Sequence, residues 1–139
     1  MSIVYSGDNN QNLKKLVNKF LVASSFSTNK KVLVLTDKTQ VVQEGFDIYI
    51  VPFDMEVPNK EKSVTYSLSN NRANVVVVNI QNHPETKSFE IMTDTSIGRA
   101  FINNKSKIQV EDVMICSAIF YGLGLDLTVI LDVLNSILK

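Results

Sequence analysis

The chain has 139 residues, 45% of them hydrophobic and 20% charged, and its 14 Lys and Arg residues balance its 14 Asp and Glu residues. This length and composition predict a single globular domain, residues 1–139, that buries a core of its own. A net charge of zero creates no basic field, so nucleic acid and an anionic membrane are not expected partners. One Cys and one His exclude an intramolecular disulfide and argue against a zinc site.

The sequence contains no run approaching the ~20 apolar residues that cross a bilayer. Its first five residues, MSIVY, lack the basic start and apolar centre of a signal peptide. We therefore expect a cytoplasmic protein.

Strand and helix patterns alternate in the first half of the chain. Residues 2–5 are a short apolar run typical of a buried strand, and a cluster of turn formers follows at residues 6–10. A helix is predicted over residues 10–23, with its apolar residues on one face and Lys14, Lys15 and Lys19 on the other, which we interpret as its solvent face. Nearly continuous apolar runs predict further strands at residues 31–36 and 46–51, as in a parallel sheet.

The second half begins with strands and ends in helices. Strands are expected at residues 64–68 and 73–81, then a turn at 82–85 and a hairpin of residues 87–92 and 98–102. The last third is the most apolar part of the chain and predicts two helices joined at Gly122-Leu123-Gly124, with Asp126 as the second N-cap. The apolar faces expected for these two helices are Val110, Val113, Met114, Ser117, Ala118 and Tyr121, and then Val129, Ile130, Val133, Leu134 and Ile137.

Together these patterns predict an α/β fold. Its mixed sheet would have a P-loop or Rossmann-like β-α-β start, antiparallel strands in the middle and a C-terminal helical hairpin. The apolar hairpin needs a surface to pack on, which the sheet would provide.

Four segments carry a family resemblance. Residues 63–67 read SVTYS, residues 73–80 read ANVVVVNI, residues 109–116 read QVEDVMIC and residues 122–126 read GLGLD. In this order they resemble motifs of the ATP-binding central domain of the Mur ligase family, which includes folylpolyglutamate and cyanophycin synthetases. The resemblance covers roughly the last half of the chain and implies the central-domain fold.

The turn after the first strand is similar to the phosphate-binding loop of that family, G-T-N-G-K-[TS]. It reads Ser6, Gly7, Asp8, Asn9, Asn10, Gln11 and Asn12. Gly7 and Asn9 match the motif, and Asn10 replaces the second glycine but tolerates positive φ, so the loop shape could survive. Gln11 replaces the lysine that would hold phosphates, and Asn12 replaces the hydroxyl that would bind magnesium. We therefore expect no ATP–Mg cofactor, although the amides at the helix start remain available to a weaker anion.

Other positions also lack residues that the family uses to bind its nucleotide, metal and substrates. The His-Asn pair that the family associates with the nucleotide falls on Ile108 and Gln109, and a second asparagine of that motif falls on Asp112. The short connection after residue 37 leaves no room for the family's stretch of metal and substrate ligands. We also find no counterpart of its UDP-binding and amino-acid-binding domains. The resemblance thus implies a shortened, degenerate relative.

The remaining polar residues offer one candidate acidic site. Asp37 and Asp54 follow neighbouring predicted strands, where α/β proteins bind ligands or Mg²⁺. Asp37 with Asp8 is similar to the acidic site of a receiver domain, but the antiparallel middle strands argue against that fold, and solvated loop charges are the commoner explanation. We interpret His83 as a surface turn residue and Cys116 as a buried, inert thiol, so no catalytic residue and no metal ligand is predicted.

Two hypotheses follow from the sequence. The first is a non-catalytic Mur-ligase-like binding or assembly protein, for which we expect a homo-oligomer or a protein partner. The second is a small nucleotide- or anion-binding enzyme that uses the Ser6–Asn12 turn in another way.

Overall fold

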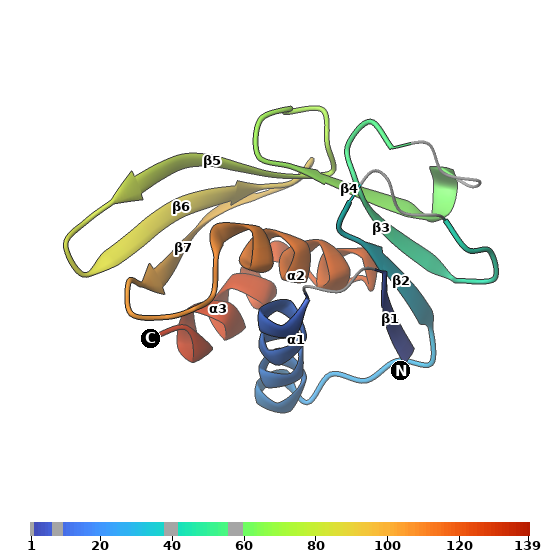
Figure 1. The fold of residues 1–139 in the computed structure, drawn as a ribbon, viewed down its shortest axis with the longest axis horizontal. Coiled ribbons are helices and arrows are strands. Elements are labelled where there is room, and N and C mark those ends of the chain that lie inside the picture. The colour runs from blue at the N-terminus through green and yellow to red at the C-terminus, as the bar shows by residue number, and fades with distance from the viewer. Residues whose placement is uncertain (1, 7–9, 38–41, 56–59) are drawn as a thin grey trace.

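Seven strands form one sheet, and they lie side by side in the order in which they occur in the chain. The computed structural model describes residues 2–6, 10–37, 42–55 and 60–139 (Figure 1). The strands are β1 (Ser2–Ser6), β2 (Lys31–Leu35), β3 (Ile48–Pro52), β4 (Ser63–Ser67), β5 (Val75–Asn82), β6 (Thr86–Met92) and β7 (Ile97–Asn103). Neighbours from β1 to β5 pair in parallel, whereas β5 with β6 and β6 with β7 pair antiparallel. The predicted mixed sheet is confirmed.

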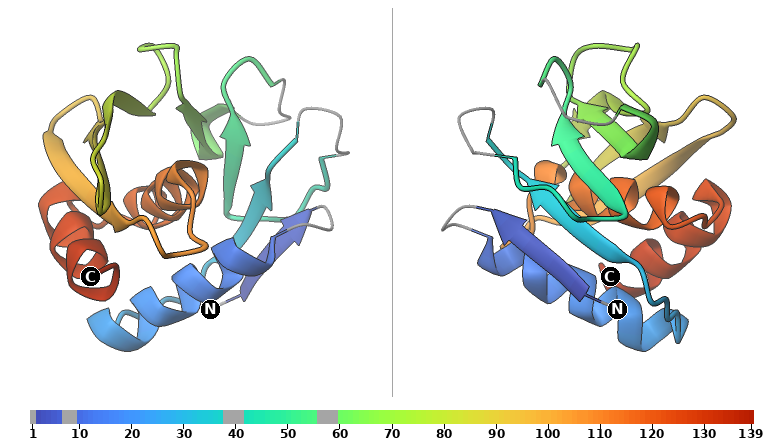
Figure 2. Two further views of the ribbon diagram at one scale, coloured as in Figure 1. Left: turned by 60° about the vertical axis from the view of Figure 1, so that its left-hand side comes forward. Right: turned by 90° about the vertical axis from the view of Figure 1, so that its right-hand side faces the viewer.

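Three α-helices cover one face of this sheet (Figures 1 and 2). They are α1 (Gln11–Ser24), which connects β1 to β2, and the closing pair α2 (Val110–Gly122) and α3 (Leu127–Ile137). The short 3-10 helix η1 (Lys60–Lys62) precedes β4. Helix α2 contacts β3, β4 and β5, and α3 contacts β7, so the C-terminal hairpin packs on the sheet as expected.

The opposite face of the sheet is covered by connections instead of helices. Leu33, Leu35, Tyr49 and Val51 are buried there and contact side chains of the loops before and after β3, among them Phe46 and Met55. Parallel strands usually carry a crossover helix on each connection. In the part of the chain that the structure describes, only the connection from β1 to β2 contains an α-helix, and α2 and α3 come from the end of the chain to complete the helical layer.

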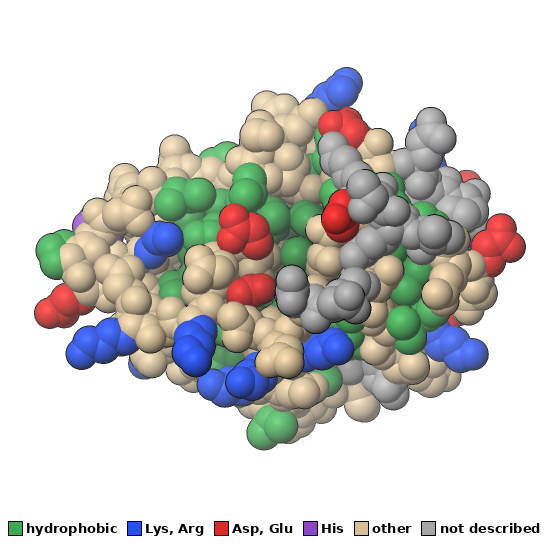
Figure 3. Space-filling model, in the orientation of Figure 1, with side chains coloured by type: hydrophobic (Ala, Val, Ile, Leu, Met, Phe, Trp, Pro, Cys, Tyr) green, Lys and Arg blue, Asp and Glu red, His purple; other side chains and the backbone are tan. Residues whose placement is uncertain are grey.

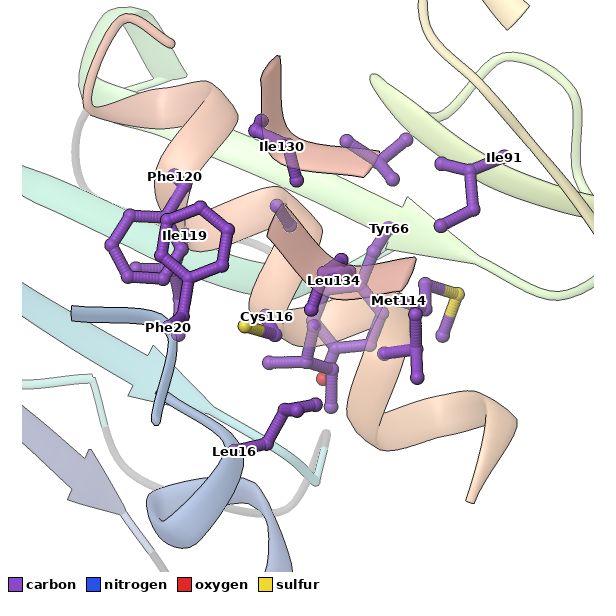
Figure 4. Close-up of a cluster of buried hydrophobic side chains, with 14 of the residues drawn as sticks. Leu16, Phe20, Tyr66, Ile91, Met114, Cys116, Ile119, Phe120, Ile130 and Leu134 are labelled. Carbon is purple, nitrogen blue, oxygen red and sulfur yellow. The ribbon is translucent and has the colours of Figure 1, made fainter. Parts of the chain in front are cut away.

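Helix α2 is the centre of the core (Figure 4). Nine residues of α2 are buried: Val110 and every residue from Val113 to Phe120. They lie on all sides of the helix, because the sheet, α1 and α3 enclose it. Phe120 stacks on Phe20 of α1 with ring centroids 3.9 Å apart. The predicted face of α2 lies in the core, and the buried surface is wider than predicted because Ile115, Cys116, Ile119 and Phe120 are buried as well. On α3, Val129 is exposed and Leu131 is buried, which corrects the predicted face of that helix.

Two glycines at the end of α2 have different roles. Gly124 takes φ +98° and follows the C-cap Leu123. The N–H groups of Gly124 and Leu125 donate to the carbonyls of Tyr121 and Phe120, both at 3.0 Å, which is the Schellman pattern. Gly122 lies against the sheet, and a Cβ there would come within 2.9 Å of Val64. The helix therefore ends through Gly124 and approaches β4 closely through Gly122.

No helix in the described part of the chain combines the length and apolarity needed to cross a bilayer.

Candidate functional site

The carbonyl of Ser6, at the end of β1, accepts two hydrogen bonds from side chains. This oxygen accepts a 3.3 Å hydrogen bond from Asn10 Nδ2 and a 3.4 Å hydrogen bond from Thr36 Oγ1, which follows β2. Asn10 is buried and is the N-cap of α1, with φ −114°. The positive φ considered for Asn10 is therefore not adopted. The other candidates in this turn, Gly7, Asp8 and Asn9, lie outside the described residues.

Gln11 and Asn12 form the start of α1 at the positions of the family's lysine and hydroxyl. Gln11 is exposed and carries no charge. Asn12 Nδ2 donates a 3.1 Å hydrogen bond to the backbone carbonyl of Lys107, in the loop before α2. This bond joins residues 95 positions apart in sequence, so Asn12 connects the first turn of α1 to the loop before α2.

Gln109 and Asp112, two of the positions that fall on the family's nucleotide-associated motif, cap the start of α2. Gln109 is the N-cap of α2, and its backbone N–H donates a 2.9 Å hydrogen bond to the Asp112 carboxylate. The Gln109 side chain accepts in return from the Asp112 backbone, which completes a capping box. Ile108 packs against the core. Partial burial raises the pKa of Asp112, and the hydrogen bond from Gln109 opposes that rise.

The two candidate acids lie at the same end of the parallel sheet. Asp37 follows β2 and is exposed. Asp54 is also exposed and takes φ +74° in a turn after β3, closed by a 3.2 Å hydrogen bond from the Met55 N–H to the Pro52 carbonyl. Among the described residues, no three acidic, His or Cys side chains are grouped so that they could hold a metal ion. A role for Asp37 and Asp54 in ligand binding stays a prediction.

A buried hydrogen bond connects the ends of β2 and β4 near Asp37. The Tyr66 hydroxyl donates to the Leu35 carbonyl at 2.7 Å. Burial raises the pKa of Tyr66, and the charge of Asp37 raises it further. Tyr66 is therefore a neutral, structural hydroxyl at the end of the sheet.

His83 and Cys116 lie in the surroundings expected from the sequence. His83 is exposed in the turn between β5 and β6, where its backbone N–H donates a 2.8 Å hydrogen bond to the Thr86 carbonyl. Cys116 is fully buried in α2, and that burial raises the pKa of its thiol. A protonated thiol without solvent contact is a poor nucleophile.

The fold and its first turn define an α/β domain in which a parallel strand leads through a polar turn into a helix. Neither a family model nor a curated protein sequence matches the chain. Solved structures do match. Over 97% of this chain and 46% of the other, it superposes with a TM-score of 0.65 and 11% identity on the UDP-N-acetylmuramoylalanyl-D-glutamyl-2,6-diaminopimelate–D-alanyl-D-alanyl ligase of Acinetobacter baumannii.

Two further structures support the same fold. A crystal structure of MurF from Acinetobacter baumannii gives a TM-score of 0.64 at 12% identity, over 96% of this chain and 44% of that one. A UDP-N-acetylmuramoyl-L-alanyl-D-glutamate–2,6-diaminopimelate ligase gives 0.55 at 15% identity, over 76% and 27%. The chain thus has a Mur-ligase-like fold, and it spans less than half the length of the ligases it matches.

Proposed function

We propose that this chain is a non-catalytic Mur-ligase-like domain that acts as a binding or assembly protein in the cytoplasm. The observation that carries the proposal is the bond between Asn12 and the Lys107 carbonyl. It uses the side chain at the position of the magnesium-binding hydroxyl, beside a Gln11 that has no charge for a phosphate. The capping box of Gln109 and Asp112 supports the proposal, since it gives two more of the family's ligand-contacting positions a structural role.

The replacement of the phosphate-loop lysine by Gln11 is the change that should lower the free energy of ATP binding most. Hydrogen bonds between a charged donor and a phosphate are roughly twice as strong as neutral ones, and the lysine of a phosphate loop also neutralises the charge of the terminal phosphates. Gln11 provides at most a neutral amide there. With Asn12 in place of the hydroxyl, the chain would also lack the usual side-chain ligand for the Mg²⁺ that accompanies the triphosphate.

Titration calorimetry with ATP and Mg²⁺ tests this proposal. We expect no binding heat for the wild-type chain, and a Mur ligase serves as the positive control. Saturable ATP binding that depends on Mg²⁺ and disappears in Gly7→Ala would contradict the proposal.

A second function has one observation in its favour. Among the described residues, the Asn10 side chain forms no capping hydrogen bond to the amides of α1, and amides at a helix start can bind an anion. A small nucleotide- or anion-binding enzyme could use this turn. Inorganic pyrophosphate, titrated without ATP, separates this function from the first: binding that Gly7→Ala removes would favour the enzyme.

The assembly surface that we propose is the free edge of β1. Among the described strands it pairs with β2 alone, and its residues Ser2-Ile3-Val4-Tyr5-Ser6 include no charge that would discourage a further strand. Figure 2 shows β1 as the outermost strand. Val4 is 38% exposed on it.

The sequence of β1 is suited to pairing with a second copy of itself. An antiparallel pair centred on Val4 would place Ile3 opposite Tyr5 of the other copy and Ser2 opposite Ser6. A two-fold axis at Val4 thus places serine opposite serine, valine opposite valine and isoleucine opposite tyrosine. Such a self-complementary surface is what an isologous interface requires. The two seven-stranded sheets would then be continuous.

Light scattering over a concentration series tests this assembly. We expect dimers for the wild type and monomers for Val4→Lys, because the two lysines would lie opposite each other on the axis. Ile97→Lys is the matched control, since Ile97 is 55% exposed on the other edge strand. A wild-type monomer at all concentrations, or equal dissociation in both variants, would contradict assembly through β1.

A further inference from the structure

Five lysines surround a cleft that the sequence did not predict. The cleft has a volume of about 370 Å³ and lies between α1, the loop joining β7 to α2, and the end of α3. The lysines are Lys15 and Lys19 of α1, Lys105 and Lys107 of the loop, and Lys139. No Asp or Glu side chain lines it.

The lysines of this cleft have no acidic side chain beside them in its lining. Among the described residues, the one ion pair found joins Arg99 to Glu90, on β7 and β6, and none involves these lysines. Figure 3 shows Lys and Arg side chains gathered along the lower edge of the molecule, where α1, α3 and the loop meet. In a chain with no net charge, this is a local concentration of cations, and holding like charges together disfavours the empty cleft relative to one that contains an anion.

The floor of the cleft is aliphatic. Leu16 and Leu138 are buried at 1% and 6% exposure, and Ile108 and Ile137 are partly buried beside them. No aromatic side chain lines the cleft. A single-stranded nucleic acid would find phosphate contacts there but no platform on which its bases could stack.

We propose that this cleft binds an acidic, leucine-rich or isoleucine-rich segment of a partner protein. Asp and Glu side chains of that segment would pair with the lysine rim, and an aliphatic side chain would cover the floor made by Leu16 and Ile108. The inference rests on the proposed binding function and specifies the chemistry of its partner. Of the described residues of the Ser6–Asn12 turn, Asn12 alone lines the cleft, at its edge beside Lys107.

Fluorescence anisotropy with a labelled synthetic peptide of alternating Glu and Leu residues tests the proposal. The expected result is saturable binding that weakens as salt is added, and weakens by about tenfold or more in a Lys105→Glu/Lys107→Glu variant. Lys60→Glu/Lys62→Glu is the matched control, because it makes the same charge change at exposed positions in η1. Its affinity should equal that of the wild type, apart from a small general charge effect.

Two further measurements test the proposal even if the charge-reversal variant fails to fold: a variant with a milder charge change, and NMR mapping of the peptide site on the wild type. Lys15→Gln/Lys19→Gln removes charge without reversing it and should weaken the peptide by a smaller factor than the loop reversal. In the wild type, amide NMR shifts on adding peptide should concentrate on residues 103–109 and the end of α3.

Four outcomes would overturn the inference. They are no peptide binding, equal loss in the control variant, NMR shifts elsewhere, and tighter binding of an oligothymidine, which would assign the cleft to nucleic acid. ATP–Mg²⁺ is titrated in the same assay. Its binding would contradict the proposed function, whereas peptide binding that the loop variant abolishes would still support the cleft, so the two failures are distinguishable.

Discussion

The side chain of Asn135 on α3 forms hydrogen bonds with the backbone of Phe101 and Arg99, at the outer edge of β7. Its Oδ1 accepts a 3.2 Å hydrogen bond from the Phe101 backbone N–H, and its Nδ2 donates a 2.9 Å hydrogen bond to the Arg99 carbonyl. A neighbouring strand would offer the same donor and acceptor to β7. One edge of the sheet is therefore partly covered by a side chain, whereas β1 at the other edge has no such cover among the described residues. This asymmetry is why we assign assembly to β1.

Replacing Asn135 by Ala should open the edge of β7. Two exposed hydrogen bonds are lost and water takes their place, so the free energy of unfolding should fall by only about 0.5–1.5 kcal/mol. The larger effect should be association through the freed edge at high protein concentration. Urea unfolding and light scattering measure the two effects, with Ser136→Ala, an exposed neighbour on α3, as control. Unchanged association would mean that Asn135 does not protect the edge.

Replacing Tyr66 by Phe should leave the Leu35 carbonyl without its 2.7 Å donor in a buried place. The expected loss in free energy of unfolding is about 1–3 kcal/mol, because a buried unsatisfied acceptor retains its desolvation cost. Tyr49→Phe is a close control. Tyr49 is also buried, but its hydroxyl accepts a longer 3.4 Å hydrogen bond from the Phe46 N–H. Thermal unfolding that ranks the two variants equally would show that the Tyr66 bond has no special weight.

Replacing Gly124 by Ala should destabilise the joint between α2 and α3. A Cβ there meets no atom within 4 Å, so the cost comes from φ +98° alone and should be about 1–2 kcal/mol. Gly124→Asn should recover part of this loss, because asparagine enters the left-handed region more readily. Chemical denaturation measures both variants. If Ala and Asn are equally harmful, backbone strain is not the reason.

The sequence predicted the fold well where local pattern and local structure coincide. The strands and α1 came within two residues of their observed ends, because short apolar runs and the Leu13–Leu16–Phe20 spacing are local signals. The faces of α2 and α3 were less predictable. They depend on which partners enclose each helix, as when Leu131 packs against Gly98 of β7.

The candidate site shows the same limit more clearly. The missing lysine at Gln11 can be read directly from the chain, but the bond from Asn12 to Lys107 cannot, because it depends on how α1 meets a loop 95 residues later. Lys15 and Lys19 were interpreted as part of the solvent face of their helix, and no role was predicted for Lys105 and Lys107. Their meeting in one cleft is a product of tertiary structure. The only sequence signal was the local excess of lysine in each segment.

The pH dependence of stability should contain a contribution from Asp112. Because burial raises the pKa of this carboxyl in the folded state, the folded chain holds its proton more tightly than the unfolded chain does. Stability from this group is therefore complete below the unfolded pKa of about 3.9 and falls as the pH rises through the folded pKa. Asp112→Asn retains an oxygen that can accept from the Gln109 N–H but cannot ionise. We expect this variant to lose less stability than the wild type as the pH is raised from about 4 to neutrality, with Glu111→Gln, an exposed neighbour, as control. Parallel pH profiles for wild type and Asp112→Asn in urea unfolding would show that the cap of α2 is not linked to this titration.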